Sequence, residues 1–465
     1  MMQTKRKQMF LQLYDHTGFE RRLEALALKG WKLEKCGTFL GWKFRKIEPT
    51  PLRYKVVYFP DASEYDPQPG DKQAEFMELC DQSGWEYIDH AAQMLIFCTP
   101  YPYAVPIETD AMMQVETVHK AMKKNYLPGQ IGLLVLALMQ LMIFGYRLKH
   151  EFMYAIMYDG LLVSYFAYFI MTILCIYHLA GYFMWRRKAL SAAENGIFVE
   201  TKGSNVIERL SLLALFAVMG VWLVSISDDV YLSRVAILTF VVLVAVIAIA
   251  SGSKLLMQKL GIDAGTNRIA TTFLIFGGMI AALFVVVFGG IWPSYDESLQ
   301  ETDYLTTYEY VGITHYVYDY PIPLTMEMLG IEADYEYRSR FHDVTESMFI
   351  TVYNGQELAP WGTPVKDPPE IYFTLSIPRF QGMMERVAEE VMDDNRIHGL
   401  YGEFVSTDAA PWGAEEAYVS VDENGVETCY YTLIYTDRIV EIKLPWAPTA
   451  EQMAIITDAL CDYEP

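Results

Sequence analysis

Five long apolar runs in the middle of the chain restrict its fold more than any other feature. Each approaches the roughly 20 residues that a helix needs to cross about 30 Å of hydrocarbon. Buried helices of soluble proteins are seldom so long or so free of charge. The sequence therefore predicts a multi-pass membrane protein with five transmembrane helices, the third being the shortest. They are expected at residues 128–146, 160–184, 210–226, 235–252 and 269–292.

Charge is distributed unevenly around these runs. Basic and acidic residues number 17 and 17 in residues 1–128, 11 and 8 in residues 129–291, and 8 and 33 in residues 292–465. The net charge of −22 therefore comes from the last third of the chain. This balance excludes a basic nucleic-acid binder for the chain as a whole. A hydrophobic content of 52% also excludes an acidic disordered chain.

The loops between the runs predict an orientation. If the chain before residue 128 is cytosolic, eleven basic residues flank the spans inside and three flank them outside, as the positive-inside rule requires. Five crossings then put the N-terminus in the cytosol and the C-terminus outside the cell membrane. We expect a cytosolic α+β domain over residues 1–127, a transmembrane region over residues 128–292, and an acidic, tyrosine-rich extracytoplasmic α+β domain over residues 293–465.

The first hundred residues contain two related helix–strand units. Each unit has a helix, expected at residues 20–29 and 72–82, that ends at a Gly-Trp pair. Glycine adopts the left-handed conformation that ends many helices, which explains Gly30 and Gly84. Thr17 with Glu20 is expected to form a capping box for the first helix, and Asp71 to cap the second. Strands are expected at residues 31–36, 41–47, 53–59, 85–88 and 94–98.

Apolar spacing predicts which side chains of these units are buried. Phe76, Leu79 and Cys80 form the expected apolar stripe of the second helix. Trp31 and Trp85 open the strands that follow each helix, and they are interpreted as core residues in preference to a ligand-binding pair.

An ordered set of motifs in this region is similar to a known family. The motifs are ALKGWKL at 27–33, WKF at 42–44, YKV at 54–56, GWEY at 84–87, and PIETD at 106–110 after Phe97. Over roughly residues 15–110 the chain resembles the bacterial family catalogued as domain of unknown function 2812. The resemblance implies a head that often precedes membrane helices, with genes for PadR-like transcriptional regulators commonly nearby. It therefore implies regulation, with a component of a PadR-like pathway as a cytosolic partner, and it assigns no catalytic residue.

Basic residues alternate along two neighbouring strand segments of this domain. Alternation places such residues on one side of a strand, so we expect one exposed basic face. A solvated face is the interpretation that we favour, and contact with anionic lipid or an acidic partner is the alternative. Direct nucleic-acid binding is not expected because no recognition helix accompanies the face. The residues of this predicted face are Lys43, Arg45, Lys46, Arg53 and Lys55.

The residue pattern of the last third of the chain predicts a strand meander followed by a terminal helix. Residues 422–425 (DENG) predict a turn, and Thr449 with Gln452 predicts a capping box. Helices are expected at residues 381–393 and 449–461. Strands are expected at residues 308–320, 347–353, 371–377, 417–421, 428–435 and 439–444.

Two Ala-Pro-Trp-Gly quartets, at residues 359–362 and 410–413, lie between these strands. An exposed tryptophan there could stack on a sugar or a peptide, and folding onto the core as a plug is the other interpretation, which we favour. Acidic pairs in this region lack the spacing of an EF-hand loop. Cys429 and Cys461 permit one disulfide, although spacing does not decide whether they pair.

No catalytic, cofactor-binding or metal-binding motif is found, so we expect no enzyme and no cofactor. The uncharged span interiors argue against a coupled transporter, which usually needs ionisable groups there. The leading hypothesis is a non-enzymatic sensor or regulator that links an extracytoplasmic binding domain, whose ligand is unknown, to a cytosolic interaction domain. A transport or channel component that uses the helix bundle as a path or scaffold is the alternative, and an envelope enzyme with a dispersed site comes third.

Overall fold

The described part of the computed structural model packs as two compact units. One comprises Met1–Met139 and Ala167–Tyr295, and the other comprises Gln140–Phe166 and Asp296–Pro465. The predicted domain boundaries at residues 127 and 292 stay predictions. The structure describes residues 3–464 apart from 8, 10–13, 38–40, 61, 64, 66–69, 92, 202–209, 211–212, 215–216, 218–219, 221–229, 287–303, 332–337, 363–367, 398–402 and 423.

The N-terminal head contains two three-stranded antiparallel sheets with a helix from each repeat. The first sheet has the order β1-β3-β2 and the second has the order β4-β6-β5. All five predicted strands are confirmed, whereas β1 was missed because its four residues, TKRK, contain no apolar side chain. The elements are β1 (Thr4–Lys7), α1 (His16–Leu28), β2 (Trp31–Lys35), β3 (Trp42–Lys46), β4 (Arg53–Tyr58), α2 (Asp71–Gln82), β5 (Glu86–Ala91) and β6 (Met94–Thr99).

The helix ends of the head follow the predicted glycines, but the predicted caps at the helix starts are wrong. Gly30 and Gly84 have φ values of +77° and +87°, the left-handed conformation expected after each helix. Helix α1 begins at His16, so Thr17 lies inside it, and neither α1 nor α2 has a side-chain cap. Glu20 instead accepts a hydrogen bond from the backbone N–H of Val56, at 2.8 Å.

The two repeated tryptophans occupy different environments. Trp85 is buried and donates a hydrogen bond from Nε1 to the carbonyl of Val105, at 2.7 Å. Trp31 is half-buried, with the Lys5 and Lys46 ammonium groups 3.8 and 4.8 Å from its ring centroids. Both tryptophans pack against the hydrophobic core, Trp85 as a buried residue and Trp31 as a half-buried one. In α2, Leu79 is 58% exposed and does not belong to the buried stripe.

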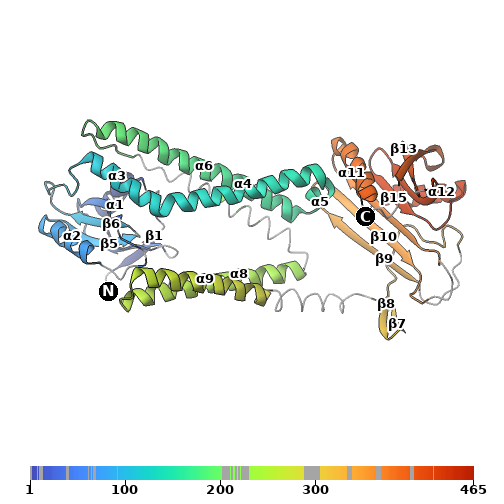
Figure 1. Ribbon diagram of the computed structural model, residues 1–465, viewed down its shortest axis with the longest axis horizontal. Coiled ribbons are helices and arrows are strands. Elements are labelled where there is room, and N and C mark those ends of the chain that lie inside the picture. Colours follow the sequence, from blue (N-terminus) through green and yellow to red (C-terminus); the bar gives the residue numbers. More distant parts are fainter. Residues whose placement is uncertain are drawn as a thin grey trace. The chain divides into compact units, whose positions relative to one another are not determined.

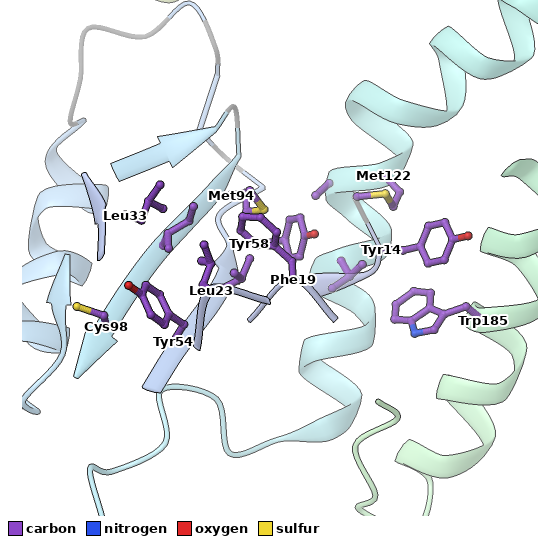
Figure 2. Packing of buried hydrophobic residues seen from close by; sticks show 14 of the residues in the cluster. Tyr14, Phe19, Leu23, Leu33, Tyr54, Tyr58, Met94, Cys98, Met122 and Trp185 are labelled. Carbon is purple, nitrogen blue, oxygen red and sulfur yellow. The ribbon is translucent and has the colours of Figure 1, made fainter. Parts of the chain in front are cut away.

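The core of the head extends onto the helices that follow it. Helix α3 (Ala111–Ala121) continues through the π-helical turn η1 (Met122–Tyr126) into α4 (Leu127–His150). Side chains of α3, η1 and α6 (Asp159–Ala193) join α1 and the strands in one hydrophobic cluster. Figure 2 shows this cluster from Leu33 and Cys98 in the strands to Tyr14 and Trp185.

Four helices are long and apolar enough to cross a membrane. They are α4, α6, residues Ile237–Lys259 of α8 (Val230–Lys259), and residues Ala264–Val285 of α9 (Ala264–Val286). The predicted span at residues 210–226 lies largely outside the described residues. Helices α8 and α9 pack closely, because a Cβ on Gly278 would lie 2.9 Å from a methyl group of Val246. A small residue there suits close helix packing.

The C-terminal domain is built on a seven-stranded antiparallel sheet of order β12-β13-β14-β15-β11-β10-β9. Successive residues of a strand face opposite sides, so Val352 of β10 packs with helix α11 and Tyr353 packs with the cluster of helix α12. Figure 1 shows both helices next to this sheet. The strands are β9 (Ser339–Glu346), β10 (Ile350–Leu358), β11 (Ile371–Pro378), β12 (Glu403–Thr407), β13 (Glu416–Val421), β14 (Glu427–Ile434) and β15 (Ile439–Lys443).

Helices and a hairpin complete this unit. Residues predicted as one strand, 308–320, form the hairpin β7 (Thr306–Tyr310) and β8 (Ile313–Val317), because Val311 and Gly312 both have positive φ and reverse the chain. The strands β9 and β12 were not predicted. The capping box of Thr449 and the turn at Gly425 are confirmed. The helices are α5 (Phe152–Met157), η3 (Gln381–Met383), α11 (Met384–Ile397), η4 (Ala410–Trp412) and α12 (Ala450–Cys461).

Candidate functional site

The predicted basic face does not form a single surface. Strands β3 and β4 belong to different sheets. The bases Lys43, Arg45 and Lys46 therefore lie on the first sheet, and Arg53 and Lys55 lie on the second. Strand β1 is the neighbour of β3 instead, and it pairs Arg6 with Lys43 and Thr4 with Arg45. The basic surface of the first sheet is therefore shared between β1 and β3.

Several of these bases already have partners within the head. Lys43 lies 2.7 Å from a carboxylate oxygen of Glu34. Arg53 donates to the carbonyl of Pro102, at 2.7 Å. The ammonium group of Lys55, whose side chain is only 20% exposed, lies between the carboxylates of Glu20 and Glu108, at 3.5 and 3.4 Å. Lys55 thus stabilises the head internally, and contact with lipid or a partner stays a prediction for the bases of β3.

The cluster around Lys55 contains the head's most perturbed carboxyl group. The pKa of Glu20 is raised to about 7, mainly by burial and also by the nearby Glu108, although Lys55 and the Val56 amide oppose the rise. His16, one turn earlier in α1, is fully buried, and burial lowers its pKa to about 3. These groups are enclosed in the head, so they bear on its stability and do not form an open site.

The tryptophans of the two Ala-Pro-Trp-Gly quartets differ in burial. Trp412 is 1% exposed, its ring lies 5.1 Å from that of Tyr431, and its carbonyl accepts hydrogen bonds from Tyr435 and Thr457. It is the core plug that we favoured from the sequence. Trp361, in contrast, is 72% exposed.

Trp361 lies at the edge of an aromatic cavity of about 330 Å³. Its ring is nearly parallel to His315, which in turn stacks on Tyr308, with interplanar angles of 19° and 18°. The backbone N–H of Trp361 donates to the hydroxyl of Tyr308 at 2.6 Å, which ties the loop to strand β7. The other lining residues are Tyr316, Val317, Tyr318, Ser339, Phe341, Gln356, Leu358, Ala359 and Pro360.

Gly362 explains how this loop approaches the hairpin so closely. Its φ is +85°, and a Cβ built on it would lie 2.2 Å from Cε2 of Tyr310. Any other residue would therefore clash with the hairpin and strain the backbone. The glycine of the quartet thus positions Trp361 beside the cavity.

The chemistry of the cavity suits a neutral ligand with both polar and apolar faces. Its described lining residues include no Asp, Glu, Lys or Arg, so the converging carboxylates that an envelope enzyme would need are not found there. Aromatic rings supply large apolar surfaces, and a few polar groups, among them Ser339 and Gln356, can orient a ligand. Among the residues that the structure describes, no group of three or more His, Cys, Asp and Glu could hold a metal ion.

The sequence predicted only part of this site. The quartet at residues 359–362 was noted, but nothing distinguished it from the buried quartet. The aromatic run at residues 308–320 supplies most of the opposite wall, and its hairpin turn at Val311 was not predicted. Cys429 and Cys461, for which a disulfide was left open, are both free thiols.

A known family model matches the head from the start of α1 to the start of α4. Residues 16–128 match the family model described as Protein of unknown function (DUF2812). This confirms the resemblance expected from the Gly-Trp repeats. The DUF2812 match excludes β1 and covers about a quarter of the chain, so it describes the head alone and assigns no role to any residue. No curated protein and no solved structure matches the chain.

Proposed function

We propose that the chain is a membrane receptor that acts by binding and not by catalysis. In this proposal the C-terminal domain, outside the membrane, binds a neutral carbohydrate in the cavity beside Trp361, and the DUF2812 head, in the cytosol, passes the signal to a protein partner. The carrying observation is the exposed Trp361, stacked with His315 and Tyr308 over a cavity with no Asp, Glu, Lys or Arg among the described residues that line it.

The shape and charge of the cavity support a sugar as the ligand class. Flat aromatic rings pack against the apolar face of a sugar ring, while nearby hydroxyl and amide groups can bond its hydroxyls. An anionic ligand is disfavoured, because the surrounding third of the chain carries 33 acidic and 8 basic residues.

Contacts within the C-terminal unit support a route from this domain to the apolar helices. The N–H of Phe152 in α5 donates to Glu390 of α11 at 2.7 Å, and Arg386 of α11 donates to the carbonyl of Lys149 at 2.7 Å. The N–H of Met348 donates to Asp159, the first residue of α6, at 2.8 Å. A change in the position of β10 or α11 would therefore move the chain at both ends of α5.

Contacts within the N-terminal unit support a matching route at the head. Tyr182 and Trp185 of α6 pack in the same cluster as Tyr14 and α1. Asn267 of α9 donates to the carbonyl of Tyr65 at 3.0 Å, so the connector between the two repeats also touches a predicted span. Helices α4 and α6 each contribute residues to both units, which makes them the simplest carriers of a signal.

The test uses full-length protein in lipid nanodiscs and a panel of neutral oligosaccharides, with chitotetraose and maltotetraose as the first probes. Binding is measured by calorimetry, and hydrogen exchange is followed by mass spectrometry in peptides from residues 306–361 and 16–58. We expect saturable binding, protection around the cavity, and altered exchange in the head. Trp361→Ala should abolish all three, whereas Phe380→Ala, which removes another exposed aromatic of this domain, should leave them intact.

The outcomes separate the alternatives. Binding without any change in the head would refute the receptor and leave a binding protein. If the panel yields no binding that depends on Trp361, the carbohydrate assignment fails. Flux of a bound sugar across proteoliposomes would favour the transport hypothesis instead.

A further inference from the structure

A second cavity, of about 260 Å³, lies within the N-terminal unit between α3 and the last turns of α6. Its lining residues on α3 are Val115, Glu116, His119 and Lys120, and those on α6 are Arg186 and Leu190. Residues three or four positions apart share one side of a helix. The cavity is therefore formed by one face of each helix and does not depend on a loop.

The cavity concentrates positive charge that the protein leaves without an acceptor. Nε of Arg186 is buried and has no hydrogen-bond partner among the described residues. Nδ1 of His119 is 2.5 Å from the hydroxyl of Tyr182, which leaves Nε2 as the nitrogen available to a ligand. Lys120 is exposed, and the carboxylate in the lining, Glu116, is exposed as well. A buried donor without an acceptor is costly, so an anion would relieve this arrangement.

The electrostatics of His119 point the same way. Burial lowers its pKa, and the positive charges of Arg186 and Lys123 lower it further. A group that resists protonation because cations surround it gains protons when an anion neutralises them. The protonation of His119 therefore reports whether an anion occupies the cavity.

The position of the cavity along α6 indicates where the anion comes from. Phe183 and Met184 are exposed apolar residues at the end of the apolar run predicted at residues 160–184, and Arg186, Arg187 and Lys188 follow within the same helix. A group of bases that follows an apolar run marks the cytoplasmic headgroup layer of a membrane. With the orientation predicted from the sequence, the cavity opens at the depth where lipid phosphates lie.

We propose that this cavity binds the phosphodiester headgroup of an anionic phospholipid, with Arg186, Lys120 and His119 donating hydrogen bonds to its phosphate oxygens. Basic pockets between membrane helices on the cytoplasmic side are suited to such headgroups. The proposal concerns the α3–α6 cavity alone and holds whether or not the C-terminal domain binds a sugar.

The experiment uses delipidated full-length protein in nanodiscs of phosphatidylcholine with or without phosphatidylglycerol. Bound lipid is counted by native mass spectrometry, and the pKa of His119 is followed by NMR of ¹³C-labelled histidine, with His119→Gln to assign its signal. We expect phosphatidylglycerol to be retained and to raise the pKa of His119. Arg186→Gln should weaken retention about tenfold, which is about 1.4 kcal/mol, and should abolish the rise.

The matched control is Arg187→Gln, which removes the same charge from the next residue of α6 but does not line the cavity. It should change retention less than twofold. Lys120→Gln serves as a second test should Arg186→Gln not fold. Equal losses in Arg186→Gln and Arg187→Gln would overturn the proposal in favour of diffuse attraction. If glycerol 3-phosphate in solution raises the pKa of His119 as much as the lipid does, a soluble phosphate is the ligand and the lipid assignment is wrong.

Discussion

Replacing Glu20 by glutamine tests the electrostatics of the DUF2812 head. Burial gives the folded state a pKa of about 7 for this carboxyl, against an ordinary value of 4.5. Because the folded pKa is raised, its contribution to stability is fully present below pH 4.5 and is lost as the pH rises towards 7. At about 1.4 kcal/mol for each tenfold change in proton affinity, the full loss is about 3 kcal/mol, of which about 2–3 kcal/mol falls between pH 5 and 8.

Glutamine stays neutral across this range, and its amide oxygen can still accept the hydrogen bond from the Val56 N–H. The variant should therefore lose the part of the pH dependence that Glu20 causes. His16 works in the opposite direction, because its lowered pKa, about 3, makes the head gain stability as the pH rises from about 3 to 6.5. Both proteins retain His16, so the difference between them isolates Glu20.

The assay is hydrogen exchange of the full-length protein, read in peptides from α1 and β4 and corrected for intrinsic rates. The assay gives the ratio of the opening equilibrium constant of the wild-type head to that of Glu20→Gln. This ratio should be about a hundredfold larger at pH 8 than at pH 5. Glu24→Gln is the control, because Glu24 lies one turn further along α1 and accepts a hydrogen bond from the Tyr54 N–H in β4. It should keep the wild-type pH dependence. If the difference in opening free energy between the wild type and Glu20→Gln is the same at both pH values, the raised pKa of Glu20 is refuted.

Three further predictions concern the C-terminal domain and the topology. Trp412→Ala removes a buried core residue and should cost about 3–5 kcal/mol, whereas Trp361→Ala should cost less than about 1 kcal/mol, both measured by pulse proteolysis of the full-length protein. Glu357→Gln should cost about 3 kcal/mol in the same assay, because the fully buried carboxylate lies 3.0 and 3.3 Å from two arginines; an unchanged cleavage rate would contradict this. A fluorescent reporter that folds only in the cytosol should work after Asp110 and fail after Pro465, and fluorescence at both positions would mean an even number of crossings.

Local rules predicted much of this fold. The apolar runs identified the candidate spans, glycine at Gly30 and Gly84 identified the helix ends, and the Thr449 capping box identified the start of α12. Each of these features is set by residues close together in sequence. The start of α1 was predicted less well, because Thr17 and Glu20 use their side chains for contacts outside this helix.

Features that depend on distant partners were not predictable in this way. Alternation shows which side of β3 carries Lys43 and Arg45, but it does not show that β1 is the neighbour of β3 and that β4 lies in another sheet. The two quartets make the same point, since identical letters give a buried Trp412 beside Tyr431 and an exposed Trp361 beside His315. The candidate site depends on which surface each loop meets.

The π-helical turn η1, between α3 and α4, has a consequence for how the length of this chain can vary. A π-turn accommodates one more residue than an α-turn does, while the faces of the helix before and after it keep their directions. Elsewhere in the continuous helix from Ala111 to His150, gaining or losing one residue would rotate everything beyond it by about 100°. Loss of one residue within Met122–Tyr126 would instead leave an ordinary α-helix, with the head side of α3 and the membrane side of α4 still in phase. Relatives of this protein that differ by a single deletion in the helix should therefore carry it here.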